Sequence, residues 1–379
     1  MPHSSCFSAY SGDELMEKYR QIQSFRPTIG IIFSSIALGI PDLVAALRTE
    51  SIPLFGSSTA GEILVEEKAD PFHDQSAVCC FLDFDPALFR ISLFERGEAT
   101  SFFLGQQIGA WGCGQFTRPA FIIAIAGLKN DGEAIVRGIQ QAAGRSVPLF
   151  GGMAGDDGLL EDTLVFCGNR ISHDGAVVLV FDADKVDVHG IASSGWVGIG
   201  AEMMITSSDG NTVYTINGRP ATEVFKEYLD VEDSELQQIG INFPLLIRRP
   251  DGTEVLRAFL SVDFSSGSLT FAGSVPQGSL VRFSSSFGYQ TIEQAVRELE
   301  GYHAAHPHAS LLLLFSCIAR YRVAGSMTAD EVLTASRLWN APLAGFFTYG
   351  EIGHNRLGTC DFYNETLSLV LISLRKDPV

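Results

Sequence analysis

The chain reads Pro53-Leu-Phe-Gly-Ser-Ser-Thr-Ala-Gly61-Glu62 early in its length, and two later stretches repeat this pattern. They are Pro148-Leu-Phe-Gly-Gly-Met-Ala-Gly155-Asp156 and Pro342-Leu-Ala-Gly-Phe-Phe-Thr-Tyr-Gly350-Glu351. In each stretch a short apolar run passes into glycines and then reaches a carboxylate. Glycine permits positive φ and close approach to the backbone, so each stretch predicts a strand that ends in a tight, acidic loop.

The dipeptide Pro-Leu marks a longer repeat. It begins at Pro53, Pro148, Pro244 and Pro342, at spacings of 95, 96 and 98 residues. Each copy follows a stretch of helical periodicity and leads through a loop into an apolar run typical of a strand. The copy at Pro244 has a Pro-Asp-Gly turn in place of the glycine loop, which predicts a plain hairpin. The sequence therefore predicts about four helix–strand–loop–strand repeats.

The same elements predict the fold class and the domains. Strands joined by short turns alternate with helices, which indicates an α/β fold of two modules, with mixed β-sheets covered by helices. The polar stretch Ser207-Ser-Asp-Gly-Asn211 separates the repeats into two pairs. We expect an N-terminal helical extension over residues 1–27, a first module over 28–205 and a second module over 206–379.

Composition narrows the classes of partner and the location. Of the 379 residues, 46% are hydrophobic and 18% are charged, and the formal net charge is −18. An acidic chain without basic clusters is a poor match for nucleic acid or an anionic membrane. No apolar run approaches the roughly 20 residues of a membrane span, and the N-terminus lacks the apolar centre of a signal peptide. We expect a cytoplasmic protein without a nucleic-acid or membrane partner.

The seven cysteines are scattered, and none forms a Cys-x-x-Cys pair. This spacing indicates neither a zinc ribbon nor a disulfide framework. In the cytoplasm such cysteines are reduced, so we expect free thiols throughout.

The glycine loops resemble those of the FIST family, in which an N-terminal and a C-terminal module occur in tandem. In the first half the resemblance rests on Gly56-Ser-Ser-Thr-Ala-Gly-Glu62-Ile63 and Gly151-Gly-Met-Ala-Gly-Asp156. In the second half it rests on Leu314-Phe-Ser-Cys317-Ile-Ala-Arg320 and Gly345-Phe-Phe-Thr-Tyr-Gly-Glu351-Ile-Gly353. The resemblance implies a sensory protein that binds a small ligand, such as an amino acid or a small anion. It also implies signalling in trans to a histidine kinase or a cyclic-dinucleotide enzyme.

The ligand-binding residues implied by the resemblance and the loop pattern are Thr59, Gly61, Glu62, Cys317, Arg320, Tyr349, Gly350 and Glu351. Arg320 follows an apolar strand, whose end is expected at the open edge of a sheet, where a guanidinium suits a carboxylate or phosphate. The alternative is a buried Cys317 and a surface Arg320. Glu62 and Glu351 occupy equivalent loop positions and together suit an ammonium group, or else they accept hydrogen bonds from loop N–H groups.

Two positions depart from the family pattern. Ala319 precedes Arg320 where the family typically has glycine, and His354 follows Gly353 where proline is usual. Both lie where the resemblance places a ligand, so the identity of the ligand does not transfer.

No cofactor is expected, but two alternative interpretations remain open. In the first, the chain is a haem-binding nitric-oxide sensor of the same family with His354 on the iron, because neutral imidazole is a capable iron ligand. In the second, it is a hydrolase with Cys317 as nucleophile, which needs a histidine near the sulfur, and His354 is the obvious choice. No Walker-type, Rossmann or Gly-x-Ser-x-Gly string occurs. We therefore expect a sensor and not an enzyme.

Overall fold

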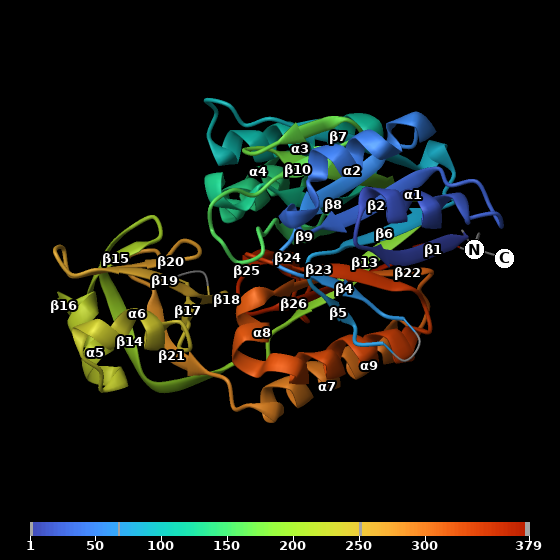
Figure 1. The fold of residues 1–379 in the computed structure, drawn as a ribbon. Helices are drawn as coiled ribbons and strands as arrows, with labels where there is room; N and C mark the ends of the chain where they lie inside the picture. Colours follow the sequence, from blue (N-terminus) through green and yellow to red (C-terminus); the bar gives the residue numbers. More distant parts are fainter. Residues whose placement is uncertain (1–2, 67–68, 250–251, 376–379) are drawn as a thin grey trace.

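Three six-stranded sheets make up the body of the protein in a computed structural model that describes residues 3–66, 69–249 and 252–375 (Figure 1). In spatial order the first sheet contains β1 (Ser4–Ala9), β6 (Ala77–Leu82), β2 (Ile29–Ser34), β3 (Leu54–Ser58), β10 (Val165–Cys167) and β11 (Arg170–Ser172). The second contains β7 (Phe89–Phe94), β12 (Ala176–Asp182), β8 (Pro119–Ile125), β9 (Leu149–Met153), β24 (Glu351–His354) and β25 (Cys360–Tyr363). The third contains β13 (Val186–Ser193), β26 (Leu367–Leu374), β22 (Leu311–Cys317), β23 (Leu343–Thr348), β4 (Glu62–Leu64) and β5 (Phe72–His73).

The three sheets follow one plan. The two central strands run parallel, as β2 with β3, β8 with β9 and β22 with β23, and the remaining neighbours are antiparallel. A parallel pair needs a crossover, which the chain makes through a helix. The crossover helices are α2 (Ile40–Leu47), α4 (Gly132–Ala143) and α9 (Ala329–Trp339). The expected α/β fold of mixed sheets covered by helices is confirmed.

Three of the four proline repeats occupy equivalent places. The carbonyl oxygens of Pro53, Pro148 and Pro342 each accept a hydrogen bond from the N–H of the neighbouring parallel strand, at 3.0, 2.8 and 2.9 Å. Proline suits the position because it directly precedes the strand, where its missing N–H breaks no ladder bond. The body is therefore a threefold repeat of strand, helix, strand, helix, strand, hairpin and strand.

The copy at Pro244 is different, and this part of the repeat prediction was wrong. Pro244 precedes β17 in an antiparallel eight-stranded sheet, where its carbonyl accepts from Ser284 N–H at 3.0 Å. That sheet is built from β14 (Val197–Asp209), β15 (Thr212–Ile216), β16 (Arg219–Pro220), β17 (Leu245–Arg248), β18 (Glu254–Arg257), β19 (Phe259–Asp263), β20 (Ser268–Phe271) and β21 (Leu280–Ser285). With α5 (Ala221–Leu229) and α6 (Asp233–Gly240) it forms a unit, the insert, that interrupts the third repeat and stands beside the body in Figure 1.

The hairpins exchange between repeats, and this exchange interlocks the two sequence modules. The hairpin β4–β5 of the first repeat extends the third sheet, β10–β11 of the second extends the first, and β24–β25 of the third extends the second. Strands from both sides of residue 205 therefore share two of the sheets. The N-terminal segment also differs from a purely helical extension, because β1 precedes α1 (Gly12–Arg20) and pairs with β6.

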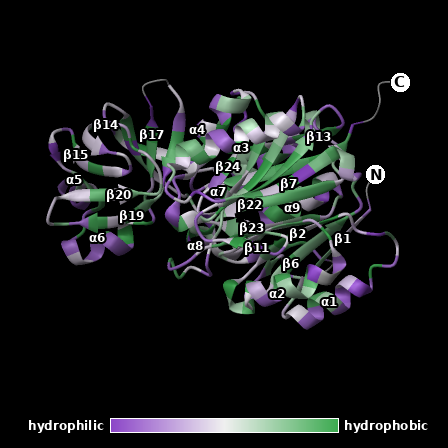
Figure 2. Cartoon of the chain, turned by 90° about the horizontal axis from the view of Figure 1, so that it is seen from above, coloured by the Kyte–Doolittle hydropathy of each residue, from purple (hydrophilic) through white to green (hydrophobic). Residues whose placement is uncertain are grey.

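Apolar side chains from all three sheets meet in a shared core, which includes Phe33, Phe55, Ile122, Phe150, Phe315 and Phe346. The outer faces of the sheets are covered by helices, among them α3 (Ser101–Gln115) and α7 (Tyr289–Ala305). Strands buried on both faces read as continuous apolar runs, and Figure 2 shows these body strands in the hydrophobic colours. The remaining short helices are α8 (Ile318–Ala324) and 3₁₀ turns at Ile36–Leu38, Arg48–Glu50, Pro86–Leu88, Gly127–Lys129 and Gly325–Thr328.

One expectation about the cysteines was wrong. Cys6 on β1 and Cys80 on β6 are directly opposite each other and form a disulfide, so these two thiols are not free. The other cysteines carry free thiols. The spacing rule missed the pair because the two partners are 74 residues apart and meet only through strand pairing. In the described ranges, no helix combines the length and apolar character needed to cross a membrane.

Candidate functional site

The glycine loops of the first and third repeats lie side by side. The N–H of Ala60 donates to the carbonyl of Phe347 at 2.9 Å, and the N–H of Phe347 donates to the carbonyl of Gly61 at 2.8 Å. Gly61 has a φ of 127°, which side-chain-bearing residues rarely adopt, so the glycine is required there. The carbonyl of Gly350 accepts from the N–H of Met153 at 2.8 Å. Both predicted glycines thus join one repeat to another.

Glu62 and Glu351 stand in matching surroundings. Each carboxylate accepts from the threonine three residues earlier, Thr59 or Thr348, and each lies at the start of an exchanged hairpin. Glu62 also accepts from Ser76 Oγ at 2.7 Å and Ser76 N–H at 3.1 Å. Glu351 accepts from the N–H of Thr366 at 3.3 Å. The sequence Thr-x-Gly-Glu therefore twice places a buried glutamate against a threonine hydroxyl and a backbone N–H.

The burial of these two glutamates decides between their alternative roles. Burial raises the pKa of Glu62 to about 7, although its hydrogen bonds oppose the shift. Burial, with the nearby charge of Glu365, raises the pKa of Glu351 well above its usual range. Both side chains are fully buried and neither lines the large cavity described below. The observed contacts are those of loop acceptors, the second of the two roles considered from the sequence.

Tyr349 and Asp156 hold the loop of the second repeat. The Tyr349 hydroxyl donates to Asp156, and that carboxylate accepts from the backbone N–H groups of Leu160, Glu161 and Asp162 at 2.9, 2.6 and 2.9 Å. Asp156 is fully buried, and its carboxyl group organises this loop through these hydrogen bonds. Since Leu160 and Tyr349 both line the cavity, Asp156 shapes part of the cavity wall.

Asp156→Ala is expected to free this loop without unfolding the body. The three backbone N–H groups lose their acceptor, and their hydrogen exchange should accelerate about tenfold or more. Exchange of residues 157–162, followed by mass spectrometry, measures the change. Glu161→Ala removes an exposed carboxylate from the same loop and is the control. Equal exchange in wild type and Asp156→Ala would show that the loop is held by other contacts.

Arg320 is not at an open edge, so that prediction was wrong. The chain turns into α8 directly after β22, which directs Arg320 inward, where it is fully buried. Its guanidinium forms an ion pair with Glu331 and donates to the carbonyls of Ser194 and Glu365. The guanidinium also lies over the ring of Trp196, 5.2 Å from the centroid. These contacts join α8 and α9 to the segment that leads into the insert.

His354 is engaged by the backbone. Its Nδ1 lies 3.1 Å from the carbonyl of Gly358, and its Nε2 accepts from the N–H of Leu149 at 3.3 Å. Burial lowers the pKa of His354, so the neutral ring is favoured. Because both ring nitrogens are engaged, His354 can act as an axial haem ligand or as a base for Cys317 only if these hydrogen bonds break. In the described parts of the chain, no group of three His, Cys, Asp or Glu side chains is arranged for a metal ion.

A cavity of about 570 Å³ lies between the body and the insert. From the body it is lined by Cys317 and Tyr349 among the predicted residues, and by Asn130, Arg322, Asn364 and Glu365, which sequence reasoning missed. The insert contributes Asn211, Ile241, Phe259, Leu260, Phe271 and Ser274. Thr59, Gly61, Glu62, Arg320, Gly350 and Glu351 do not line it. Cys317 is nearly buried, and burial with the nearby Glu351 and Glu365 raises the pKa of its thiol well above the usual range.

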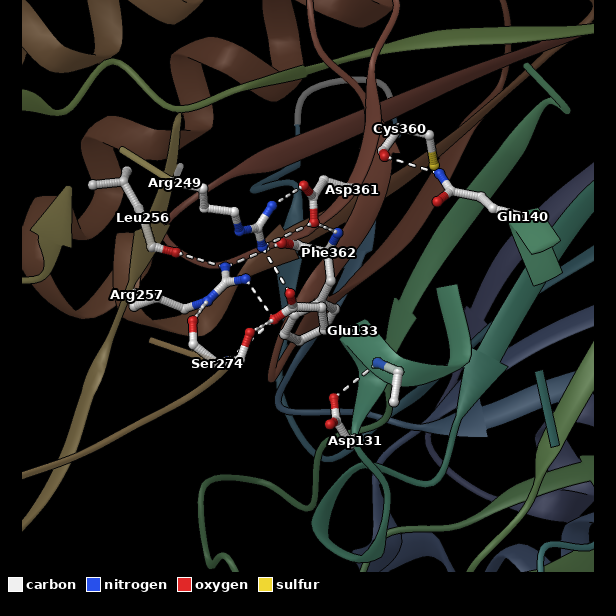
Figure 3. Close-up of polar contacts among 11 residues, drawn as sticks. Asp131, Glu133, Gln140, Arg249, Leu256, Arg257, Ser274, Cys360, Asp361 and Phe362 are labelled. Atoms are coloured by element: carbon white, nitrogen blue, oxygen red, sulfur yellow. Dashed lines mark hydrogen bonds and ion pairs between the residues drawn. The ribbon is translucent and has the colours of Figure 1, made fainter. Parts of the chain in front are cut away.

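A network of charged side chains, the latch, ties the insert to the body beside this cavity (Figure 3). It consists of Glu133 and Asp361 from the body and Arg249, Arg257 and Ser274 from the insert. Glu133 Oε1 lies 2.9 Å from Arg249, and Glu133 Oε2 lies 2.9 Å from Arg257. Ser274 Oγ donates to Glu133 Oε2 at 2.6 Å. Burial alone would raise the pKa of Glu133, but Arg257, Arg249 and Ser274 outweigh it and hold that pKa below the usual range. Glu133 is therefore a buried anion.

Comparison with known proteins places the chain in a family. A model of the FIST N domain matches residues 28–219, and a model of the FIST C domain matches residues 221–354. The chain belongs to the FIST family. These two matches confirm the resemblance seen in the glycine loops. FIST domains are sensory modules of signal transduction, so the general class of function is confirmed as well.

Similar proteins add little to this assignment. An uncharacterized protein of Mycobacterium bovis is 30% identical over 179 residues, which cover 43% of this chain and 45% of that protein. An uncharacterized protein of Mycobacterium tuberculosis is 27% identical over 187 residues, which cover 44% and 47%. The chain thus spans about half the length of the curated relatives it matches. A crystal structure of cyanuric acid hydrolase from A. caulinodans, with 8% identity, covers 99% of this chain and 100% of that chain, but the TM-score of 0.37 carries no argument.

Proposed function

We propose that this FIST protein senses a small organic ligand in the cavity between body and insert, and that the ligand shifts the position of the insert. The observation that carries the proposal is the cavity itself, which has the volume of a small-molecule site and is walled by both units. A ligand that touches both units binds their closed arrangement more tightly than an open one. Occupancy then changes the populations of the two arrangements.

The latch offers a direct route from the cavity to the interface. Ser274 belongs to both, because it lines the cavity and donates to Glu133. Gly132, Ala258 and Phe362 line the cavity and are the chain neighbours of Glu133, Arg257 and Asp361. Any ligand-induced shift of the wall therefore acts on buried charges, whose interactions depend steeply on geometry.

In this proposal the signal passes to a separate histidine kinase or cyclic-dinucleotide enzyme in the cytoplasm. The resemblance to sensory modules supports that class of partner, and the acidic charge of −18 argues against a nucleic-acid target. A role as hydrolase has less support. Burial and two neighbouring carboxyl groups disfavour the thiolate of Cys317, and the ring nitrogens of His354 are already engaged.

Ala319→Trp tests the proposal. Ala319 lines the cavity, and an indole there should fill the space that a ligand needs. In a thermal-shift screen of cellular metabolites, a ligand at a hundred times its Kd stabilises wild type by about 2.7 kcal/mol and should leave Ala319→Trp unchanged. Ala304→Trp places the same side chain on the exposed face of α7 and should respond like wild type. Equal stabilisation of Ala319→Trp would put the ligand elsewhere and contradict the proposal.

A further inference from the structure

The cavity has apolar walls and an apolar rim. Phe259, Phe271 and Phe362 are buried lining residues, whereas Leu128, Leu160 and Leu260 line it and are exposed. The buried phenylalanines mark the closed end of the cavity, and the exposed leucines mark its mouth. An apolar or aromatic body of a ligand would be desolvated against these side chains.

The closed end carries polar atoms that have no partner. Asn364 and Glu365 line the cavity and are 1% and 0% exposed, yet both Asn364 amide atoms and both Glu365 oxygens lack a hydrogen-bond partner among the described residues. Buried polar atoms are nearly always satisfied in folded proteins, and unsatisfied ones at a cavity point to a missing partner such as a ligand. Glu365 also has a φ of 54°, an unusual backbone conformation for glutamate.

Asn130 is a third residue with an unpartnered acceptor, and the orientation of its amide is fixed. Its Nδ2 donates to the carbonyls of Ala126 and Asp174, at 2.9 and 3.0 Å, so the amide cannot be turned around without losing both bonds. Its Oδ1 is buried and has no partner among the described residues, and Asn130 lines the cavity.

The unpartnered atoms are mainly acceptors. They are the four oxygens Asn130 Oδ1, Asn364 Oδ1, Glu365 Oε1 and Glu365 Oε2, against the single donor group Asn364 Nδ2. Acceptors need donors, and a carboxylate out of contact with water is best matched by a cation. A carboxylate or phosphate group would instead meet four unpartnered oxygens at this end of the cavity.

We propose that the cavity recognises a protonated amine attached to an apolar group, with the ammonium group donating to Glu365 and to the amide oxygens of Asn130 and Asn364. The inference rests on the proposed function and names the ligand class of the same site. Arg322 lines the cavity but is exposed, so the ammonium group at the closed end lies away from this cation at the mouth. The Arg320 guanidinium nearby is already paired with Glu331.

Titration of Glu365 gives the site a signature. Burial raises its pKa to about 8, while the charge of Arg320 opposes the shift. The other groups that face it are Glu351 and Cys317, whose own pKa values are raised, and Asp131 and Arg322 line the same cavity. An ammonium group binds the ionised carboxylate, so amine affinity should rise about twentyfold between about pH 6.5 and about pH 8.5. Amines remain protonated over this range, since their ordinary pKa is about 10.

The test uses three probes of nearly equal size, 2-phenylethylamine, 2-phenylethanol and 3-phenylpropionate, titrated calorimetrically into the full chain. We expect the amine to bind about tenfold or more tighter than the alcohol at about pH 8, and the carboxylate to bind weakest. In Glu365→Gln the preference for amine over alcohol and its pH dependence should vanish. The substitution should fold, because Gln75 occupies the equivalent place before β6 with a φ of 50°.

Glu62→Gln is the matched control, because it neutralises a buried glutamate outside the cavity and should keep the amine preference. A preference for the carboxylate or the alcohol, or an amine preference that survives in Glu365→Gln, overturns the inference. Binding of none of the three probes also overturns it, whereas the sensor proposal is judged separately by the Ala319→Trp screen. If the amine binds Ala319→Trp as well as wild type, the amine site lies outside the cavity and the inference is overturned, while the sensor proposal is still judged by its own screen.

Discussion

Arg320→Ala should lower the free energy of unfolding by about 3–5 kcal/mol, the range observed when one partner of a buried ion pair is removed. Arg320 and Glu331 are both fully buried, so solvent does not screen the loss. The substitution leaves the Glu331 carboxyl without its cation and removes the donor to the carbonyls of Ser194 and Glu365. Burial already raises the pKa of Glu331 to about 7 against the opposing charge of Arg320.

Arg322→Ala is the control for this prediction. It removes an exposed arginine two residues further along the same helix and should change stability by less than about 0.5 kcal/mol. Arg320→Lys should recover part of the loss, because a point charge replaces a fork that makes three contacts. Urea denaturation of the three variants measures the differences. A loss in Arg320→Ala no greater than in Arg322→Ala would mean that the ion pair contributes nothing to the fold.

The buried position of Arg320 could not be predicted from the local sequence pattern. The sequence correctly predicted an apolar strand before Arg320, and this strand is β22. A ligand-binding role for the residues beyond it stays a prediction. The direction of Arg320 depends on the turn into α8 and on a glutamate eleven residues later, and neither follows from the strand pattern. The one clue was composition, since Glu331 lies on the buried face of α9 together with Val332, Thr334, Ala335 and Trp339.

The repeat shows a different limit. Three Pro-Leu copies were found correctly because their glycine loops impose the same backbone geometry in each sheet. The fourth copy fitted the spacing by coincidence, since Pro244 directly precedes a hairpin strand in the insert. Glycine content around the dipeptide, and not the dipeptide itself, was the physical signal. Hairpin exchange between repeats could not be read at all, because strand partners are set by tertiary packing.

The cavity was only partly visible in the sequence for a related reason. Cys317 and Tyr349 lie in the family-like strings, but ten of the 25 residues that line the cavity come from the insert, whose strands have no distinctive motif. Asn364 and Glu365 follow a hairpin and resemble an ordinary polar turn. Their significance depends on being buried without partners, a property of packing.

Glu133→Ala should be the most damaging single change at the interface of body and insert. It leaves Arg257, which is fully buried, without its paired carboxylate, and removes one of the anions that pair with Arg249. The expected loss is about 3–5 kcal/mol, because an uncompensated buried cation remains. Part of that loss should appear as separation of the insert, so exchange of the Ser274 amide, which donates to Glu133, should increase.

Two comparisons make this prediction sharp. Glu133→Gln keeps a hydrogen-bond acceptor for Ser274 but removes the charge, so its loss should be smaller than that of Glu133→Ala. Glu202→Ala breaks the pair with Arg248, an exposed ion pair of the insert, and should cost less than about 1 kcal/mol. If Glu133→Ala melts like Glu202→Ala and leaves exchange at Ser274 unchanged, the latch does not hold the insert. The insert would then be held by the apolar contacts around the cavity, and ligand binding would have no buried charges through which to move it.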